Sequence, residues 1–341
     1  MADILTALPR RPLGRTGIPV SLIGFGAAPL GDLYGTLDDV LAIAALTEAV
    51  TLGVNLVDTS PLYGHGLSEH RCGTALRRVG RDAVVLSTKV GRWIDVGAGR
   101  GDGSGYHGGQ PHAAVVDYSA EGTRRSVEQS LLRLGTDRID LLLIHDVDHW
   151  THGAAVEQRF QEAMEGAYPV LHRMREQGVI RAIGIGVNDA GICTRFARTG
   201  DFDAMLLAGR YSLLEQPALD EFLPLAQEKQ IGVLLGGVFN SGILATGPVP
   251  GAKYNYRDAP PPVLAQVGRI EAVCRAHGVP LPHAALQFAL AHPAVSSVVL
   301  GATTPDEVRR NLEALDRPAP AALWSDLREA GLLRPDAPVP A

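Results

Sequence analysis

The stretch SAEGTRRSVEQSLLRLGTDRIDLLLIH, residues 119–145, contains one complete unit of the fold. Ser119 is a favourable helix N-cap, and Gly135 stands where a helix over 119–134 should end. The apolar run IDLLLIH at 139–145 follows, and it is typical of a strand covered on both faces. It ends in one polar residue, His145. This order predicts an α/β protein with a parallel sheet.

The same unit recurs along the whole chain. Eight alternations of strand and helix predict a (β/α)8 TIM barrel, with an open doubly wound sheet as the alternative. The other predicted strands lie at 21–26, 54–58, 83–89, 180–187, 203–209, 231–236 and 296–301, and the other predicted helices at 37–52, 67–79, 155–177, 189–199, 215–229, 261–277 and 305–315.

Several segments fall outside this repeat. We expect an N-terminal β-hairpin at about 8–20 that closes the barrel bottom, and an additional helix at 281–293 before the last strand. A Gly-rich loop covers 95–112, and a C-terminal tail covers 317–341. We find no midpoint boundary, so we expect residues 1–341 to form a single barrel domain.

Composition excludes several classes of protein. The 341 residues carry Lys+Arg 31 against Asp+Glu 37, a net charge of -6, which argues against capture of nucleic acid by bulk charge. No apolar run reaches the roughly 18 residues of a membrane helix. The first residues do not follow the order of a secretory signal. Three scattered cysteines argue against a disulfide framework and favour a reducing cytoplasm.

Isolated polar residues follow the predicted strands at their carboxyl ends, where barrel enzymes place their chemistry. Asp58 ends the second strand, Lys89 the third and His145 the fourth, and Tyr63 lies in the loop after Asp58. An ammonium beside a phenol should lower the phenol pKa, and a carboxylate would hold the lysine charged. The four residues are therefore candidates for general acid/base catalysis of a carbonyl–alcohol conversion. Each taken singly has an ordinary explanation, as a turn cap, a solvated lysine, a core histidine or a rim aromatic.

These residues stand in motifs that resemble the aldo-keto reductase superfamily. The motifs are VDTSPLYGHGLSE at 57–69, STK at 87–89 and LLLIHD at 141–146. RPLGRTG at 11–17 and IRAIGIGVND at 180–189 match as well, so the resemblance runs over about residues 10–316. It implies that Tyr63 is the proton donor or acceptor, that Lys89 and Asp58 tune it, and that His145 orients the substrate oxygen.

The resemblance also implies a nicotinamide cofactor bound across the barrel mouth without a Rossmann domain. Gly26 and Ala27 would lie near the nicotinamide, Asp58 beside them, and Tyr211 would stack on the ring. Asn188 would contact the carboxamide, because Ala208 stands where many relatives have glutamine. The pyrophosphate loop would be Gly237, Val238, Phe239, Asn240, Ser241 and Gly242, and the adenosine end Gly301, Thr303, Glu307 and Asn311.

One departure from the family bears on the cofactor. NADP-preferring relatives often carry lysine at the position of Gly301 and arginine at that of Glu307. A carboxylate there would repel a 2′-phosphate and accept a hydrogen bond from a 2′-hydroxyl. We therefore expect NAD to be preferred, although Arg309 and Arg310 leave NADP possible.

The sequence leaves the substrate open. GVN at 186–188, GRYSLLEQ at 209–216 and FNSGIL at 239–244 resemble the aldose dehydrogenase branch, whose members oxidise sugars such as L-fucose at C1, and pyridoxal dehydrogenases are similar there. The small-molecule substrate is therefore a sugar or pyridoxal. The same residues are also compatible with a Schiff-base aldolase on Lys89 and with a non-catalytic cofactor sensor. Aromatic and imidazole side chains that could line the cleft are Trp93, His149, Trp150, Phe239 and Tyr254.

The His-rich segment HDVDHWTH at 145–152 suggests a metal site at first sight. It lacks the HExxH spacing and lies where a strand runs into a loop. We therefore expect no metal. Oligomeric state cannot be predicted from this sequence.

Overall fold

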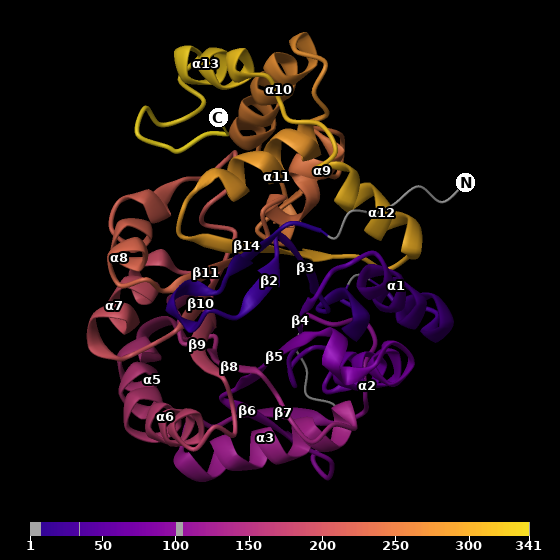
Figure 1. The fold of residues 1–341 in the computed structure, drawn as a ribbon, viewed down its shortest axis with the longest axis vertical. Coiled ribbons are helices and arrows are strands. Elements are labelled where there is room, and N and C mark those ends of the chain that lie inside the picture. Colours follow the sequence, from indigo (N-terminus) through magenta and orange to yellow (C-terminus); the bar gives the residue numbers. More distant parts are fainter. Residues whose placement is uncertain (1–7, 34, 100–104, 341) are drawn as a thin grey trace.

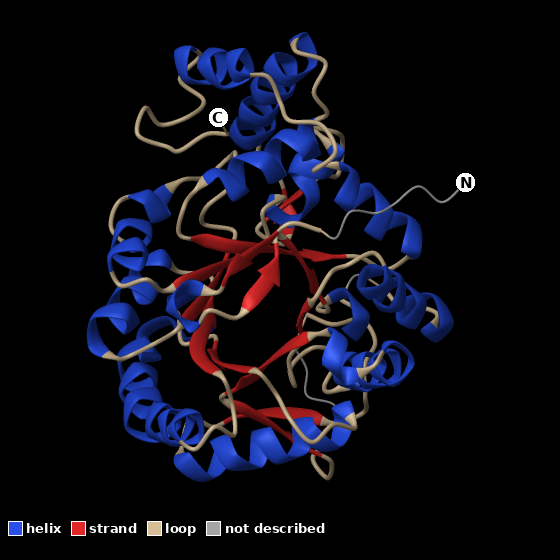
Figure 2. Ribbon diagram, viewed as in Figure 1, coloured by secondary structure: helices blue, strands red, loops and turns tan. Residues whose placement is uncertain are grey.

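The computed structural model describes residues 8–33, 35–99 and 105–340, and it confirms the (β/α)8 TIM barrel. Eight parallel strands pair side by side and close on themselves, with helices outside them (Figure 1, Figure 2). Each predicted strand is present, with boundaries shifted by a few residues. In order around the barrel, the strands are β3 (Ile23–Gly26), β4 (Leu56–Asp58), β5 (Val85–Val90), β8 (Leu141–His145), β9 (Ala182–Val187), β10 (Ala204–Ala208), β11 (Gly232–Gly236) and β14 (Val295–Gly301).

Four of the helices that cover the barrel begin at side-chain caps, among them the predicted Ser119. Asp38, Ser119, Asp189 and Thr304 each accept a hydrogen bond from a backbone N–H of the first turn. The helices are α1 (Asp39–Thr51), α2 (Leu67–Val79), α3 (Ala120–Leu134), α5 (Val156–Glu162), α6 (Tyr168–Glu176), α7 (Ala190–Thr199), α8 (Phe222–Glu228), α10 (Pro261–Ala276), α11 (Leu281–Ala291) and α12 (Pro305–Glu313), with the short helices α4 (His149–His152) and α9 (Ile243–Thr246) in loops.

Three features differ from the sequence-based expectation. The helix expected at 155–177 is divided, because a π-helical turn at Ala163–Ala167 separates α5 from α6. A further helix, α13 (Ala321–Glu329), lies within the tail and buries Leu323, Trp324 and Leu327. The Gly-rich loop is flanked by an antiparallel pair, β6 (Arg92–Asp95) and β7 (Ala113–Val116), while residues 100–104 lie outside the described residues.

The N-terminal hairpin consists of β1 (Arg10–Pro12) and β2 (Pro19–Ser21), paired antiparallel. Leu13, Ile18 and Val20 are buried in one apolar cluster with strand residues such as Leu56 and Leu143. The hairpin therefore fills the amino-terminal end of the barrel, as the sequence predicts.

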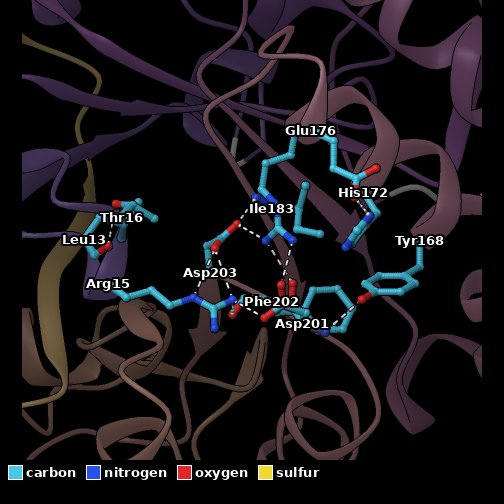
Figure 3. A network of polar contacts seen from close by, with 11 residues as sticks. Leu13, Arg15, Thr16, Tyr168, His172, Glu176, Ile183, Asp201, Phe202 and Asp203 are labelled. Carbon is cyan, nitrogen blue, oxygen red and sulfur yellow. Dashed lines mark hydrogen bonds and ion pairs between the residues drawn. The ribbon is translucent and has the colours of Figure 1, made fainter.

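A polar network fastens this hairpin to the barrel bottom (Figure 3). Arg15 pairs with Asp201 and Asp203, while Asp203 Oδ2 accepts from the Ile183 backbone N–H at 3.0 Å and from Arg175 at 2.7 Å. Tyr168 Oη accepts from the Asp201 N–H at 2.9 Å. All of these groups lie at the end opposite to the strand ends that carry the candidate site. Within the described ranges, no helix has both the length and the hydropathy that crossing a bilayer requires.

Candidate active site

The strand ends of β4, β5 and β8 bring the predicted residues together around one cavity. Tyr63, Lys89 and His145 all line it, and its volume is about 750 Å³. Asp58 lies beneath them, almost fully buried, at the last position of β4. The cavity opens at the carboxyl end of the barrel, where substrates of this architecture bind.

Lys89 is held by two short contacts. Its Nζ donates to Asp58 Oδ2 at 2.6 Å and to the Thr59 carbonyl at 2.7 Å. Ser87 Oγ, two residues earlier on β5, donates to Asp58 Oδ1 at 2.8 Å. Because the side chain of Lys89 is only 1% exposed, this pairing is what makes a buried ammonium tolerable. The Lys89–Asp58 ion pair therefore lies in a fixed position at the bottom of the cavity.

Tyr63 is placed by a tight crossing of two loops. Built on Gly31, a Cβ atom would stand 2.5 Å from the carbonyl carbon of Tyr63, so this approach requires glycine. The following Gly64 has φ of +61°, which reverses the chain into α2. Lys89 Nζ lies 4.7 Å from the centroid of the Tyr63 ring.

The pKa of Tyr63 differs in direction from the sequence-based expectation. Burial and the nearby Asp58 carboxylate raise the pKa of Tyr63 well above its usual value. The expectation of a lowered pKa is therefore wrong for this structure, because burial and the Asp58 carboxylate outweigh the attraction of the Lys89 ammonium. Tyr63 is protonated at neutral pH and is set to donate a proton.

His145 is neutral and points into the cavity. Burial, together with the charges of Lys89 and Arg92, lowers the pKa of His145 well below its usual value. Its Nδ1 lies 3.2 Å from Ser60 Oγ, and its Nε2 lies 3.3 Å from Asp146 Oδ1. With Ser60 as the donor to Nδ1, the proton of the neutral ring stays on Nε2 and faces the cavity.

Residues predicted for the cofactor line two clefts that adjoin this cavity. Asn188 is shared between the cavity and a small cleft that Gly237, Asn240, Ser241 and Arg210 line. A second cleft, of about 420 Å³, contains Gly301, Thr303 and Glu307 together with Pro29. Pro29 follows Ala28, which lines the main cavity, so the two clefts adjoin it on different sides.

These clefts fit an extended dinucleotide. Gly237, Asn240, Ser241 and Gly242 all have positive φ, a backbone form found in anion-binding loops, while the N–H groups of Asn240 and Gly242 donate to the Gly237 and Phe239 carbonyls. Glu307 Oε2 accepts from Thr303 N and Oγ1 at 2.7 and 2.9 Å, and Asn311 Nδ2 donates to the Gly301 carbonyl at 3.4 Å. Gly26 is the register partner of Asp58 on the adjacent strand, at the carboxyl ends of β3 and β4. Ala27 and Val238 are buried and do not line the cavity, and the Ala27 backbone is already engaged, because its N–H donates to the Asp58 carbonyl at 2.8 Å and its carbonyl accepts from Ser68 Oγ at 2.7 Å.

Tyr211 is not where the family resemblance implies. Its side chain is fully buried, with ring centroids 5.2 Å from Phe288 and 5.6 Å from His292. Helix α11 supplies Phe288 and covers this ring, so Tyr211 belongs to the core and does not line the cavity. The expectation that it stacks on a nicotinamide is wrong in this structure.

Three of the five expected cleft residues also lie elsewhere. Trp93 stacks on Arg125 at 3.5 Å, because alternation along β6 turns it to α3. Tyr254 donates its hydroxyl to Glu215, and Phe239 packs on the core. Trp150 does line the cavity and is 53% exposed, whereas His149 lines the neighbouring cleft and contacts Asp189.

Sequence reasoning missed several side chains that line the cavity, and four of them bear on its chemistry. Arg92 and Asp146 form an ion pair at 2.9 Å beside His145, and Tyr106 and Tyr256 line the wall. Alternation counted from Lys89 assigns Trp93 to the cavity side and Arg92 to the opposite side. Gly91, with φ of +97°, interrupts the alternation between β5 and β6, and this is why Arg92 faces the cavity. Asp146 follows His145 directly, and strand alternation would have assigned it to the opposite face.

The histidines of the His-rich segment contact different partners and do not converge on one point. His149 faces Asp189, and His152 Nε2 lies 3.0 Å from Tyr118 Oη. In the part of the chain that the structure describes, no group of three or more His, Cys, Asp or Glu side chains is arranged to hold a metal.

The geometry can be compared with known proteins. A model of the aldo/keto reductase family matches residues 22–331. The chain belongs to this family. A pyridoxal 4-dehydrogenase of Microbacterium luteolum is 40% identical over 96% of this chain and 99% of its own length. A D-threo-aldose 1-dehydrogenase of Pseudomonas is 39% identical over 93% and 96%.

A solved structure agrees with this assignment. The holo form of an aldo-keto reductase of Bacillus halodurans has a TM-score of 0.75 at 27% identity, covering 96% of this chain and 97% of that one. This aldo/keto reductase is therefore an oxidoreductase, of a family that uses nicotinamide cofactors on small molecules.

Proposed function

We propose that this aldo/keto reductase oxidises the cyclic hemiacetal form of an aldose at C1 to its lactone, with NAD as the electron acceptor. The observation that carries the proposal is the Lys89–Asp58 ion pair beneath Tyr63, with the neutral His145 on the same cavity. A sugar dehydrogenase among the relatives supports the substrate class.

The residues divide the proton chemistry between them. His145 donates from Nε2 to the C1 oxygen and fixes its position, and Tyr63 accepts the C1 hydroxyl proton. Lys89 stabilises the phenolate that accepts this proton, and Asp58 holds Lys89 in place. The nicotinamide, when bound, supplies the acceptor for the hydride that leaves C1. Hydride and proton together account for the two electrons and two hydrogens by which lactol and lactone differ.

We propose that Asn188 holds the carboxamide, that residues 237–242 hold the pyrophosphate, and that Gly301, Thr303, Glu307 and Asn311 hold the adenosine ribose. The fixed carboxylate of Glu307 supports a preference for NAD, because a 2′-phosphate would meet a negative charge. Three free, buried cysteines, Cys72, Cys193 and Cys274, support a reducing cytoplasm as the site of action.

Pyridoxal is the second candidate substrate. Its aldehyde closes to a cyclic hemiacetal, so the same chemistry would yield 4-pyridoxolactone. The aromatic walls of the cavity, Tyr106, Trp150 and Tyr256, suit a flat pyridine ring, and a pyridoxal dehydrogenase is among the relatives. A Schiff base on Lys89 is disfavoured, because its ammonium is charged and paired with Asp58.

The test is the initial rate of nicotinamide reduction with L-fucose and with pyridoxal, each with NAD and NADP. We expect turnover with NAD and L-fucose, and a loss of at least about 1,000-fold in Tyr63→Phe, which keeps the ring and removes the proton acceptor. Turnover of pyridoxal alone would favour the second candidate. Cofactor binding without turnover of either would indicate a sensor.

A further inference from the structure

We propose that Asp146 and Arg92 form a recognition site for a hydroxyl group on the carbon next to the reacting carbon. The inference rests on the proposed reaction at Tyr63 and names which small molecules that reaction selects: α-hydroxy aldehydes and the sugars that contain them.

Asp146 occupies an unusual position in the barrel. Successive strand residues alternate between faces, so the residue after His145 should turn away from the cavity. Asp146 has φ of +54°, and its N–H still donates to the Gly186 carbonyl at 2.9 Å. The left-handed backbone brings two adjacent side chains, His145 and Asp146, into the same cavity. Such strained positions concentrate at functional sites.

The pair is close to the reacting atoms. Asp146 Oδ1 lies 3.3 Å from His145 Nε2, the atom that would donate to the substrate oxygen. That contact is long for a hydrogen bond to a carboxylate. The reacting oxygen of the substrate can therefore accept a hydrogen bond from His145 Nε2, while a hydroxyl group on the neighbouring carbon donates to Asp146.

Both members of the pair have unused hydrogen-bonding capacity. The Asp146 side chain is only 15% exposed, and this burial raises its pKa. Arg92 Nη1 lies 2.9 Å from Asp146 Oδ2, yet it finds no well-aligned acceptor among the described residues. A hydroxyl group is both donor and acceptor, so it can donate to Asp146 and accept from Arg92 at once. A plain methylene can do neither, so it would leave the pair with only its mutual contact.

The experiment compares two aldehydes that differ only in this hydroxyl, lactaldehyde and propanal. We measure kcat/KM for their reduction with NADH. Sites built for a hydroxyl reject analogues that lack it, and we expect wild type to prefer lactaldehyde by at least about tenfold. Asp146→Asn should lower kcat/KM for lactaldehyde much more than kcat/KM for propanal, and so bring their ratio close to one.

Two further variants keep the test decisive. Arg92→Lys retains the charge and loses the planar fork, so it should lower the preference without abolishing propanal reduction, even if Asp146→Asn folds poorly. Asp95→Asn, on the same strand β6 as Arg92 but outside the cavity, is the matched control and should change neither rate. Melting temperatures report folding for all three.

The outcomes separate the inference from the proposed function. Equal rates of wild type on both aldehydes, or equal loss on both in Asp146→Asn, would overturn the inference. If the wild-type protein does not oxidise aldoses but still prefers lactaldehyde to propanal, the proposed function alone is overturned. L-Fucose against its 2-deoxy analogue repeats the comparison in the oxidative direction.

Discussion

Tyr63 is the residue whose protonation should set the direction of the reaction. Its raised pKa means that the phenol predominates at neutral pH, so the protein begins as a proton donor. Oxidation requires the phenolate, whose fraction grows about tenfold per pH unit below the pKa. We therefore expect kcat/KM for oxidation to rise between about pH 6 and 10, and that for aldehyde reduction to stay level and fall only at the alkaline end.

His145 should add no inflection near its ordinary pKa. The pKa of His145 is lowered, so the ring stays neutral across this range and donates from Nε2 throughout. Initial rates in both directions over the same buffers check the prediction. An oxidation rate that falls as the pH rises would contradict it.

The grouping of Asp58, Lys89 and His145 around one cavity could be predicted from the sequence, because they stand at strand ends, where topology alone brings them together. Lys89, Asp58 and His145 needed no knowledge of side-chain direction. Trp93 and Tyr211 did need it. Alternation on β6 turns Trp93 outward, and helix α11 buries Tyr211, and neither effect is visible in a motif.

The N-terminal hairpin is the element whose attachment can be tested separately from catalysis. Asp203 joins the hairpin to the barrel through Arg15, Arg175 and the Ile183 N–H, and its side chain is 7% exposed. Removing one partner of a buried pair costs about 3–5 kcal/mol. Asp201 still faces both arginines in the Asp203→Asn variant, so we expect a loss of about 2 kcal/mol in the free energy of unfolding.

Urea unfolding measures this loss, and kinetic constants provide the second readout. Because the network lies at the amino-terminal end of the strands, kcat and KM should stay unchanged under native conditions (Figure 3). The matched control is Asp82→Asn, since Asp82 is 96% exposed and its pair with Arg138 should contribute nothing measurable. A changed KM in Asp203→Asn would show that the two ends are coupled.

Element boundaries were predictable where caps and apolar runs agree, as in α3 and α7. The sequence signals failed where tertiary packing decides. The π-helical turn at Ala163–Ala167 has no local signature, and α13 depends on burying Trp324 against the rest of the molecule. The β6–β7 pair joins segments on either side of a Gly-rich loop, and alternation over four residues is a weak signal.

Across the whole molecule, the proposed cofactor site draws on both ends of the chain. Pro29 follows the first barrel strand, and Gly301, Thr303 and Glu307 follow the last, yet they line one cleft because β14 pairs with β3. A ligand there stabilises the closure of the barrel. At about 100 times its dissociation constant, NADH should raise the free energy of unfolding by about 2.7 kcal/mol.

At equal concentration NADPH should raise the free energy of unfolding less, because its 2′-phosphate meets the Glu307 carboxylate. A tenfold weaker affinity corresponds to about 1.4 kcal/mol. Glu307→Gln keeps the size of the side chain and an oxygen for the Thr303 N–H, so the start of α12 should be preserved while the charge is lost. The melting temperatures of the variant with NADH and with NADPH should then be nearly equal, and this measurement does not require turnover. If the difference between NADH and NADPH survives in Glu307→Gln, the preference arises elsewhere, and Arg309 and Arg310 become the groups to test.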